Sequence, residues 1–138
     1  MSKQLIILFL FLAGYSCLAQ EYTVIGNGTG SQSYAAAELK SIFKPRNSNW
    51  TSGRPVVIVL PGATSPIRDQ VARDMYKSSF VAMQKYWLSL VFQGRFNAPV
   101  ILNTDEETVN FIKKTPGAIG FIQDPALAPS GLLIKIKD

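Results

Sequence analysis

Five residues that follow an apolar run have the types and spacing of a turn that can hold an anion: Gly62, Ala63, Thr64, Ser65 and Arg68. A proline directly after Ser65 predicts that a helix begins here with Ser65 as its N-cap, because proline in the first turn lacks only an N–H that would be unpaired anyway. The first turn of such a helix presents free backbone N–H groups and the positive end of the helix dipole. With hydroxyl groups and a guanidinium beside it, this turn predicts an oxyanion site.

A strand and a helix would position this turn. Residues 56–60 are all apolar, which predicts a buried strand, and the apolar residues Ile67, Val71 and Met75 recur at helical spacing behind the turn. An ordinary capped helix with an arginine on its surface has the same pattern, so the spacing by itself leaves both interpretations open.

The rest of the chain alternates between short apolar runs and segments of helical spacing. Strands are expected at residues 22–25, 99–102, 118–122 and 132–137, and further helices at residues 33–43, at residues 79–93 and behind Thr104. Ser33 and Thr104 are expected as N-caps, the latter in a capping box with Glu107. The last strand is expected at a sheet edge, because it ends in alternating isoleucine and lysine. This order predicts one α/β domain with a mostly parallel sheet flanked by helices.

The first residues have the pattern of a secretory signal peptide. Lys3 precedes an apolar run at residues 5–12, which is too short to span a membrane comfortably, and a small-x-Ala sequence follows it. Cleavage after Ala19 would divide the chain into a signal peptide, residues 1–19, and one domain, residues 20–138. We expect a protein that is periplasmic or secreted. A lipoprotein anchored at Cys17 is the alternative, and the residues before the cysteine fit it poorly.

The composition argues against catalysis and metal binding. The chain has no histidine and a single cysteine, which removes the commonest general base and the usual zinc ligands. We therefore expect no catalytic residue, no metal and no cofactor. The formal net charge of +5 is scattered along the chain, which gives no sign of a nucleic-acid groove. The glycine-rich residues 26–30 lack the spacing of a dinucleotide loop and are expected to form a connector.

Three patches of the sequence, in this order, resemble the phosphate-binding proteins of ABC transporters. Residues 38–43 and the Trp50-x-x-Gly53-x-Pro55 pattern resemble the family's L-x-x-I-F-x-G-K and W-x-D-G-x-x-V segment. Residues 57–68 resemble the strand and glycine-serine-threonine turn that grip phosphate, and residues 116–121 resemble the P-G-A-I-G-Y strand. The resemblance extends over residues 24–122 and implies a single lobe of the type-2 periplasmic-binding-protein fold.

The resemblance also implies a function. It implies an exported module that binds phosphate or a similar oxyanion at the glycine turn, is associated with phosphate uptake or sensing, and has an ABC transporter or another envelope protein as its partner. The family carries an arginine and an aspartate just before the glycine turn, where this chain has Leu60 and Pro61. The alternative hypothesis is a ligand-free interaction domain with the same fold, which binds a membrane or envelope protein partner or a second copy of itself.

Overall fold

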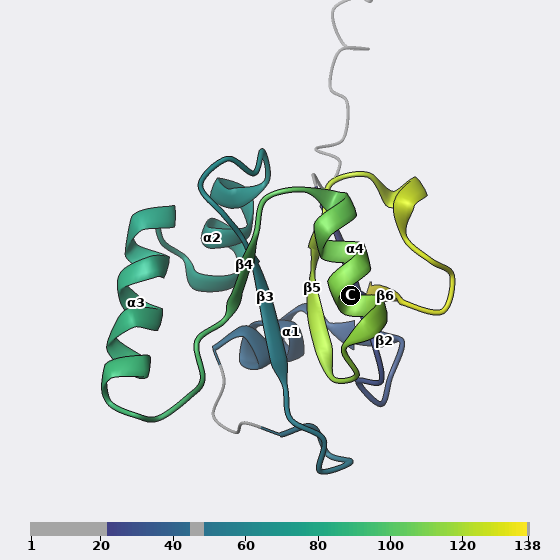
Figure 1. Cartoon of the computed structure of the whole chain (residues 1–138), viewed down its shortest axis with the longest axis horizontal. Coiled ribbons are helices and arrows are strands. Elements are labelled where there is room, and N and C mark those ends of the chain that lie inside the picture. The colour runs from purple at the N-terminus through teal and green to yellow at the C-terminus, as the bar shows by residue number, and fades with distance from the viewer. Residues whose placement is uncertain (1–21, 45–48, 138) are drawn as a thin grey trace, which may run out of the picture.

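A computed structural model describes residues 22–44 and 49–137 of the chain (Figure 1). The predicted signal peptide, Cys17 and the expected end of the first helix at Pro45 lie outside the described residues. In the described part, no helix combines the length and the apolar character that crossing a bilayer requires.

Six strands form one mixed sheet in the order β2-β6-β1-β5-β3-β4. They are β1 (Thr23–Gly26), β2 (Ser33–Ala35), β3 (Val57–Pro61), β4 (Val100–Leu102), β5 (Ala118–Ile122) and β6 (Leu133–Lys137). β3 runs parallel to β4 and β5, and β2 runs parallel to β6, whereas β1 is antiparallel to both β5 and β6. Parallel pairs therefore outnumber antiparallel ones, as the sequence predicts.

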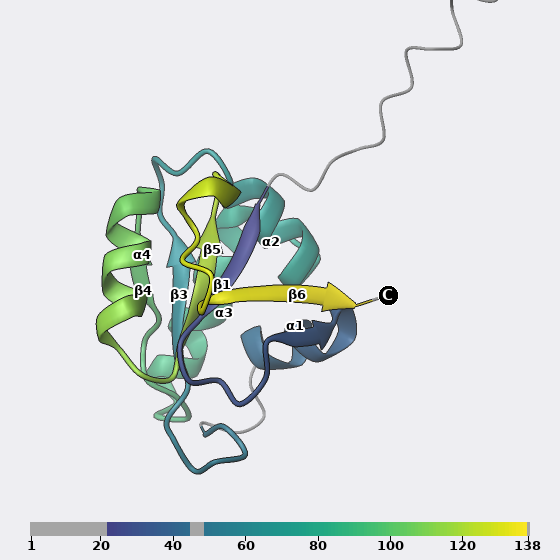
Figure 2. The same cartoon turned by 90° about the vertical axis from the view of Figure 1, so that its right-hand side faces the viewer.

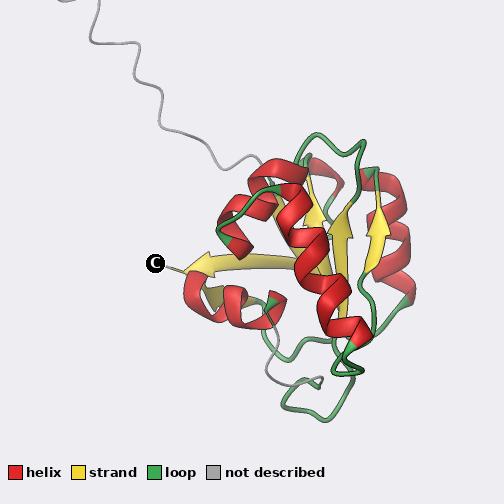
Figure 3. Cartoon of the chain, turned by 90° about the vertical axis from the view of Figure 1, so that its left-hand side faces the viewer, coloured by secondary structure: helices red, strands yellow, loops and turns green. Residues whose placement is uncertain are grey.

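Helices cover both faces of this sheet, which confirms the predicted α/β class (Figure 2). They are α1 (Ala36–Phe43), α2 (Arg68–Tyr76), α3 (Phe80–Phe92) and α4 (Asp105–Lys114), with a short 3-10 helix, η3 (Pro125–Leu127), after β5. α4 lies on one face, and α1, α2 and α3 lie on the other (Figures 2 and 3). Figure 3 views the molecule from the side of α3 and the edge strand β4.

The core has two parts because successive residues of a strand point to opposite faces. In β3, Ile58 and Leu60 join the larger cluster with α1, α2 and α3, whereas Val59 joins the smaller cluster with α4. Ile112 of α4 is fully buried against this second face. Burial of each such large apolar side chain stabilises the fold by about 1.5–3 kcal/mol.

A buried tyrosine joins the three helices of the larger layer. The hydroxyl group of Tyr76 in α2 donates to the carbonyl oxygen of Phe43 in α1 at 2.6 Å, and it accepts from Nε1 of Trp87 in α3 at 2.8 Å. Burial raises the pKa of the Tyr76 hydroxyl, since the charged phenolate would lose its hydration. This side chain therefore fixes the positions of α1 and α3 relative to α2.

Two sequence predictions about the strands and caps are wrong. Ser33 is not the N-cap of α1 but lies in β2, where it pairs with Lys135. The helix begins at Ala36, and the carboxylate of Glu38 accepts from the backbone N–H of Ala35 at 2.9 Å, which supplies the cap that serine was expected to give. Strand pairing with β6 engages residues 33–35 first, so the helix begins later.

β6 is an interior strand rather than the expected edge strand. It pairs with β1 at Leu133 and Ile134 and with β2 at residues 135–137. The alternation itself is confirmed, because Ile134 is buried while Lys135 and Lys137 are exposed. Ile134 belongs to the larger cluster and Ile136 packs against it, so the lysines that alternate with them lie on the face that carries α4, beyond the strands against which α4 packs. The alternation of isoleucine and lysine in β6 therefore reflects one solvent-exposed face of the strand and not a position at the edge of the sheet.

Candidate functional site

The candidate site lies at the carboxyl edge of the parallel strands β3, β4 and β5. Because these strands run in the same direction, the loops that follow Pro61, Leu102 and Ile122 emerge at one edge of the sheet. Ligands of open α/β sheets bind outside the carboxyl ends of the strands. The predicted turn is the first of these loops, and residues 103–104 and 123–124 form the other two.

The β3–α2 loop begins one residue later than the sequence predicts. Pro61 is still part of β3 and pairs with Leu102, and the N–H of Gly62 donates to the Leu102 carbonyl at 3.0 Å. A Cβ atom at Gly62 would collide with Oδ1 of Asn103 and approach the side chain of Ile101. Glycine at this position therefore allows the loop after β4 to pack directly against the backbone of the β3–α2 loop.

The prediction that Ser65 is the N-cap of the helix is wrong. α2 begins at Arg68, with Ile67 at the cap position. Ser65 is buried, and its Oγ atom accepts from the N–H of Ile67 at 3.4 Å, while its own N–H donates to the Gly62 carbonyl at 3.0 Å. The serine thus stabilises a turn that precedes the helix, as short hydroxyl side chains do in turns.

Asn103 completes the loop, and the sequence analysis did not include it. Its side-chain oxygen Oδ1 accepts from the backbone N–H of Thr64 at 3.0 Å. The N–H of Thr64, in the loop that was predicted to hold an oxyanion, therefore already donates to an amide oxygen of the protein. The signal in the sequence was the position of Asn103 directly after the expected strand 99–102, at the same sheet edge as the glycine turn.

Arg68 lies back over the loop that it was predicted to serve. Its Nη1 atom donates to the carbonyl oxygen of Ala63 at 2.8 Å, and its guanidinium carbon lies 4.8 Å from the centre of the Phe80 ring. Its Nε atom is 3.7 Å from the carboxylate of Asp69. Both side chains of this ion pair are well exposed, so the pair contributes little stability. The positive charge is held at the loop by the carbonyl and the ring.

The structure brings the five predicted residues together in one loop with unequal exposure. Ala63 and Thr64 are exposed, Gly62 and Ser65 are buried, and the side chain of Arg68 is 38% exposed. The residues open to a ligand are therefore Ala63, Thr64 and Arg68. In the first turn of α2, the N–H of Arg68 donates to the Ser65 carbonyl at 3.4 Å, and the N–H groups of Asp69 and Gln70 have no intrahelical acceptor.

Carboxylates occupy the neighbouring loops. Asp105, the first residue of α4, accepts from the backbone N–H groups of Gln123 and Asp124 at 2.8 and 2.9 Å. Glu106 and Glu107 follow it in the first turn of α4. The hydroxyl of Thr104 accepts from the N–H of Glu107 at 3.2 Å, which confirms the predicted N-cap. An external anion would be repelled at α4, so the β3–α2 loop is the electrostatically suited one.

The part of the chain that the structure describes contains no candidate metal site. No group of three or more acidic, histidine or cysteine side chains gathers there in a way that could hold a metal ion. Asn27, in the glycine-rich segment, donates through its side chain to the carbonyl of Ile112 at 2.9 Å at the end of α4. This contact fits the role of a connector that was expected for residues 26–30.

Comparison with solved structures finds the same fold in two proteins named for phosphate. An ABC-type phosphate transport receptor from Vibrio cholerae superposes with a TM-score of 0.61 at 14% identity, over 83% of this chain and 45% of that one. A possible phosphate binding protein from Planctomyces limnophilus DSM 3776 superposes with a TM-score of 0.60 at 19% identity, over 86% of this chain and 42% of that one. No protein-family model and no curated protein sequence matches the chain.

The chain therefore has the fold of a single lobe of these proteins, as predicted, and spans less than half the length of either. At these identities the likeness shows the fold alone. The assignment to type 2 of the periplasmic-binding-protein fold stays a prediction.

Proposed function

We propose that this protein is an exported oxyanion-binding lobe that holds phosphate or a similar tetrahedral anion at the β3–α2 loop. The observation that carries the proposal is that the loop already binds an oxygen atom, since the N–H of Thr64 donates to Oδ1 of Asn103 with the Arg68 guanidinium beside the same loop. The fold that this chain shares with a phosphate transport receptor and with a possible phosphate binding protein supports it. Binding rather than catalysis is also what a chain without histidine favours.

The anion would take the place of the Asn103 side chain. Its oxygens would accept from the N–H and hydroxyl of Thr64 and from the first-turn N–H groups of α2. The Arg68 guanidinium would exchange the neutral carbonyl of Ala63 for the anion and would gain the attraction between opposite charges. Because Ala63 and Thr64 are exposed, solvent would screen the anion, and we expect a modest affinity for the lobe by itself.

The test is calorimetric titration with phosphate at low salt, with sulfate as the comparison anion. Arg68→Ala should weaken phosphate binding by about tenfold to a hundredfold, because a hydrogen bond to a charged group contributes about 1.5–3 kcal/mol. Arg73→Ala is the matched control, since Arg73 lies on the same helix and donates to the side chain of Gln70 at 2.9 Å. An Arg68→Ala variant that binds as the native chain does, or no heat at millimolar phosphate, would contradict the proposal.

A ligand-free interaction domain is the second candidate. The same two contacts also favour this candidate, because Asn103 already occupies the N–H of Thr64 and Arg68 already donates to the carbonyl of Ala63. Such a domain would bind an ABC transporter, another envelope protein or a second copy that supplies the missing lobe. Sedimentation velocity with and without phosphate tests the two-copy clamp, and monomer alone in both conditions would count against it.

A further inference from the structure

We propose that the exposed face of α3 docks on the surface of an anionic phospholipid membrane. This inference does not depend on the oxyanion site. Val81, Leu88 and Phe92 are large apolar side chains with exposures of 55%, 55% and 82%. Their spacing places them along one side of the helix, together with Lys85. The opposite side of α3 is buried against the core through Phe80, Met83, Trp87 and Leu90.

An apolar groove extends this face toward the edge of the sheet. It has a volume of about 240 Å³ and runs between α3 and the strands β3 and β4, and charged residues are absent from its lining. Ile101 of the edge strand β4 is 51% exposed beside it. The lining includes Pro61, Met83, Leu88, Val91, Pro99 and Ile101. Contiguous exposed apolar surface of this kind marks an interaction site on a protein.

The charges of α3 and of the segments next to it in the sequence favour one class of partner. The sequence has no acidic residue between Asp74 and Asp105, and the basic residues in that segment are Lys77, Lys85 and Arg95. All three are exposed. A second copy would place these cations opposite one another, which costs free energy, whereas a negatively charged surface attracts them.

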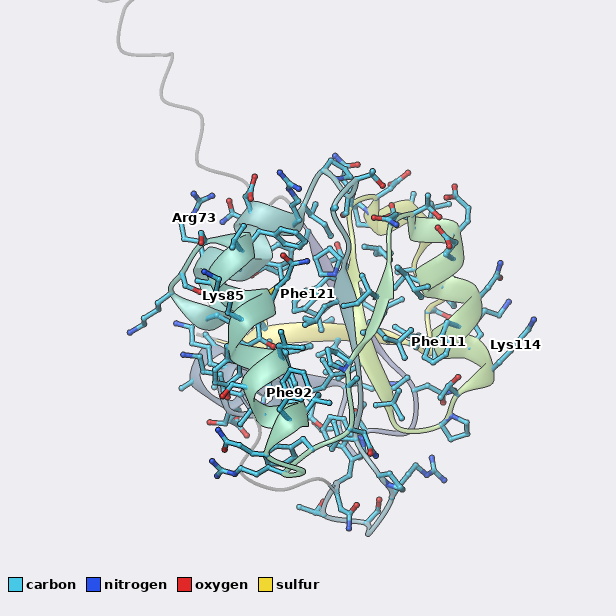
Figure 4. All side chains as sticks on the ribbon, turned by 60° about the vertical axis from the view of Figure 1, so that its left-hand side comes forward. Arg73, Lys85, Phe92, Phe111, Lys114 and Phe121 are labelled. Atoms are coloured by element: carbon cyan, nitrogen blue, oxygen red, sulfur yellow. The ribbon has the colours of Figure 1, made fainter. Side chains whose placement is uncertain are left out.

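A bilayer with anionic lipids suits both the apolar residues and the cations. Apolar side chains of an amphipathic helix enter the boundary between headgroups and acyl chains, while lysine keeps its stem there and its ammonium group among the headgroups. Figure 4 shows Lys85 and Phe92 on α3 and places Lys114 across the molecule on α4. Phe92, the most exposed of the apolar residues, would then enter the bilayer and Lys114 would remain in water.

A fluorescent reporter on α3 tests the proposal, because it detects contact of α3 itself with lipid and not binding of the chain through residues 1–19. The whole chain carrying Phe92→Trp is mixed with vesicles of brominated phosphatidylglycerol, whose bromine atoms quench indole fluorescence on contact. Lys114→Trp is the matched reporter, and the native chain gives the background of Trp50 and Trp87. We expect quenching of the Phe92→Trp reporter only, and little quenching with brominated phosphatidylcholine. Equal quenching of both reporters, or of neither, overturns the proposal and leaves an acidic protein as the partner to test.

A pair of charge variants makes the second test. Lys85→Glu should lower the partition coefficient onto phosphatidylglycerol vesicles by about tenfold or more, because each basic group near an anionic surface favours binding about fivefold. Lys114→Glu changes the net charge of the chain equally but lies on α4, so its effect should be much smaller. Equal effects of the two variants would show attraction by net charge alone and would overturn the assignment to α3.

Discussion

The side-chain oxygen of Asn103 lies 3.0 Å from the backbone nitrogen of Thr64, although 39 residues separate the two in the sequence. The contact joins the loops that follow two neighbouring parallel strands, β3 and β4. It both stabilises the candidate oxyanion loop and occupies one of its donors. The position of the Asn103 side chain therefore decides whether the N–H of Thr64 is available to an anion.

Replacing Asn103 should change stability and anion binding in opposite directions. Asn103→Ala removes one hydrogen bond, so the free energy of unfolding should fall by about 1 kcal/mol. The N–H of Thr64 becomes available, so phosphate should bind several-fold more tightly in a calorimetric titration. Asn110→Ala, on the exposed side of α4, is the control: it should leave phosphate binding unchanged and should not lower the free energy of unfolding, because alanine favours the helix. Weaker phosphate binding in Asn103→Ala would instead show that Asn103 orders the loop for its ligand.

Asp105 should contribute more to stability than its acidic neighbours. Its carboxylate accepts from two backbone N–H groups, at Gln123 and Asp124. Asp105→Ala should lower the free energy of unfolding in urea by about 2 kcal/mol, because two hydrogen bonds to a charged acceptor are lost. Glu106→Ala removes the same charge from the first turn of α4 and controls for the helix dipole. Equal losses in the two variants would mean that the carboxylate bonds add nothing.

The Tyr76 hydroxyl should be needed for the packing of the larger helical layer. Tyr76→Phe leaves the carbonyl of Phe43 and the indole N–H of Trp87 without their shared partner. We expect a loss of about 1–3 kcal/mol in urea denaturation at neutral pH. Tyr86→Phe is the matched control, because the Tyr86 hydroxyl forms no hydrogen bond within the described residues. A change of less than about 0.5 kcal/mol in Tyr76→Phe would contradict this role.

The free energy of unfolding should also depend on pH in the alkaline range, because the Tyr76 hydroxyl titrates there. Burial raises the pKa of Tyr76 above its usual value of about 10, so the native state keeps a proton that the unfolded state releases. The free energy of unfolding should therefore fall as the pH rises above about 10. Tyr76→Phe should reduce this slope. Some slope should remain, because burial also raises the pKa of Tyr86. An unchanged slope in Tyr76→Phe would place the titrating group elsewhere.

Capping residues, glycines and apolar runs correctly predicted those helices and strands whose bounds depend on residues close together in the sequence. The helix expected at residues 79–93 is confirmed as α3: the Oγ atom of Ser79 accepts from the N–H of Ala82 at 3.1 Å, and Gly94 follows the helix with a φ angle of 67°. The five residues of β5 are all buried, as their uninterrupted apolar run predicts. The carboxyl edge of β3 also carries the predicted loop.

Contacts between distant segments account for what the sequence did not reveal. β2 has three residues and exists through its pairing with β6, so no periodicity within the segment could identify it. Ser65 and the proline after it have the composition of a helix start, yet the hydroxyl stabilises a preceding turn instead. Asn103 belongs to a different loop from Thr64, and only the parallel pairing of β3 with β4 brings the two together.

The place of β6 in the sheet has a consequence for the order of events during synthesis. β6 lies between β1 and β2, so neither of these early strands has its full set of neighbours until the segment at residues 133–137 has left the ribosome. Pairing over such sequence separations is slow because the chain must close long loops first. The six-stranded sheet is therefore complete only after residues 133–137 have been synthesised, although β1, β3, β4 and β5 can pair with one another before that point.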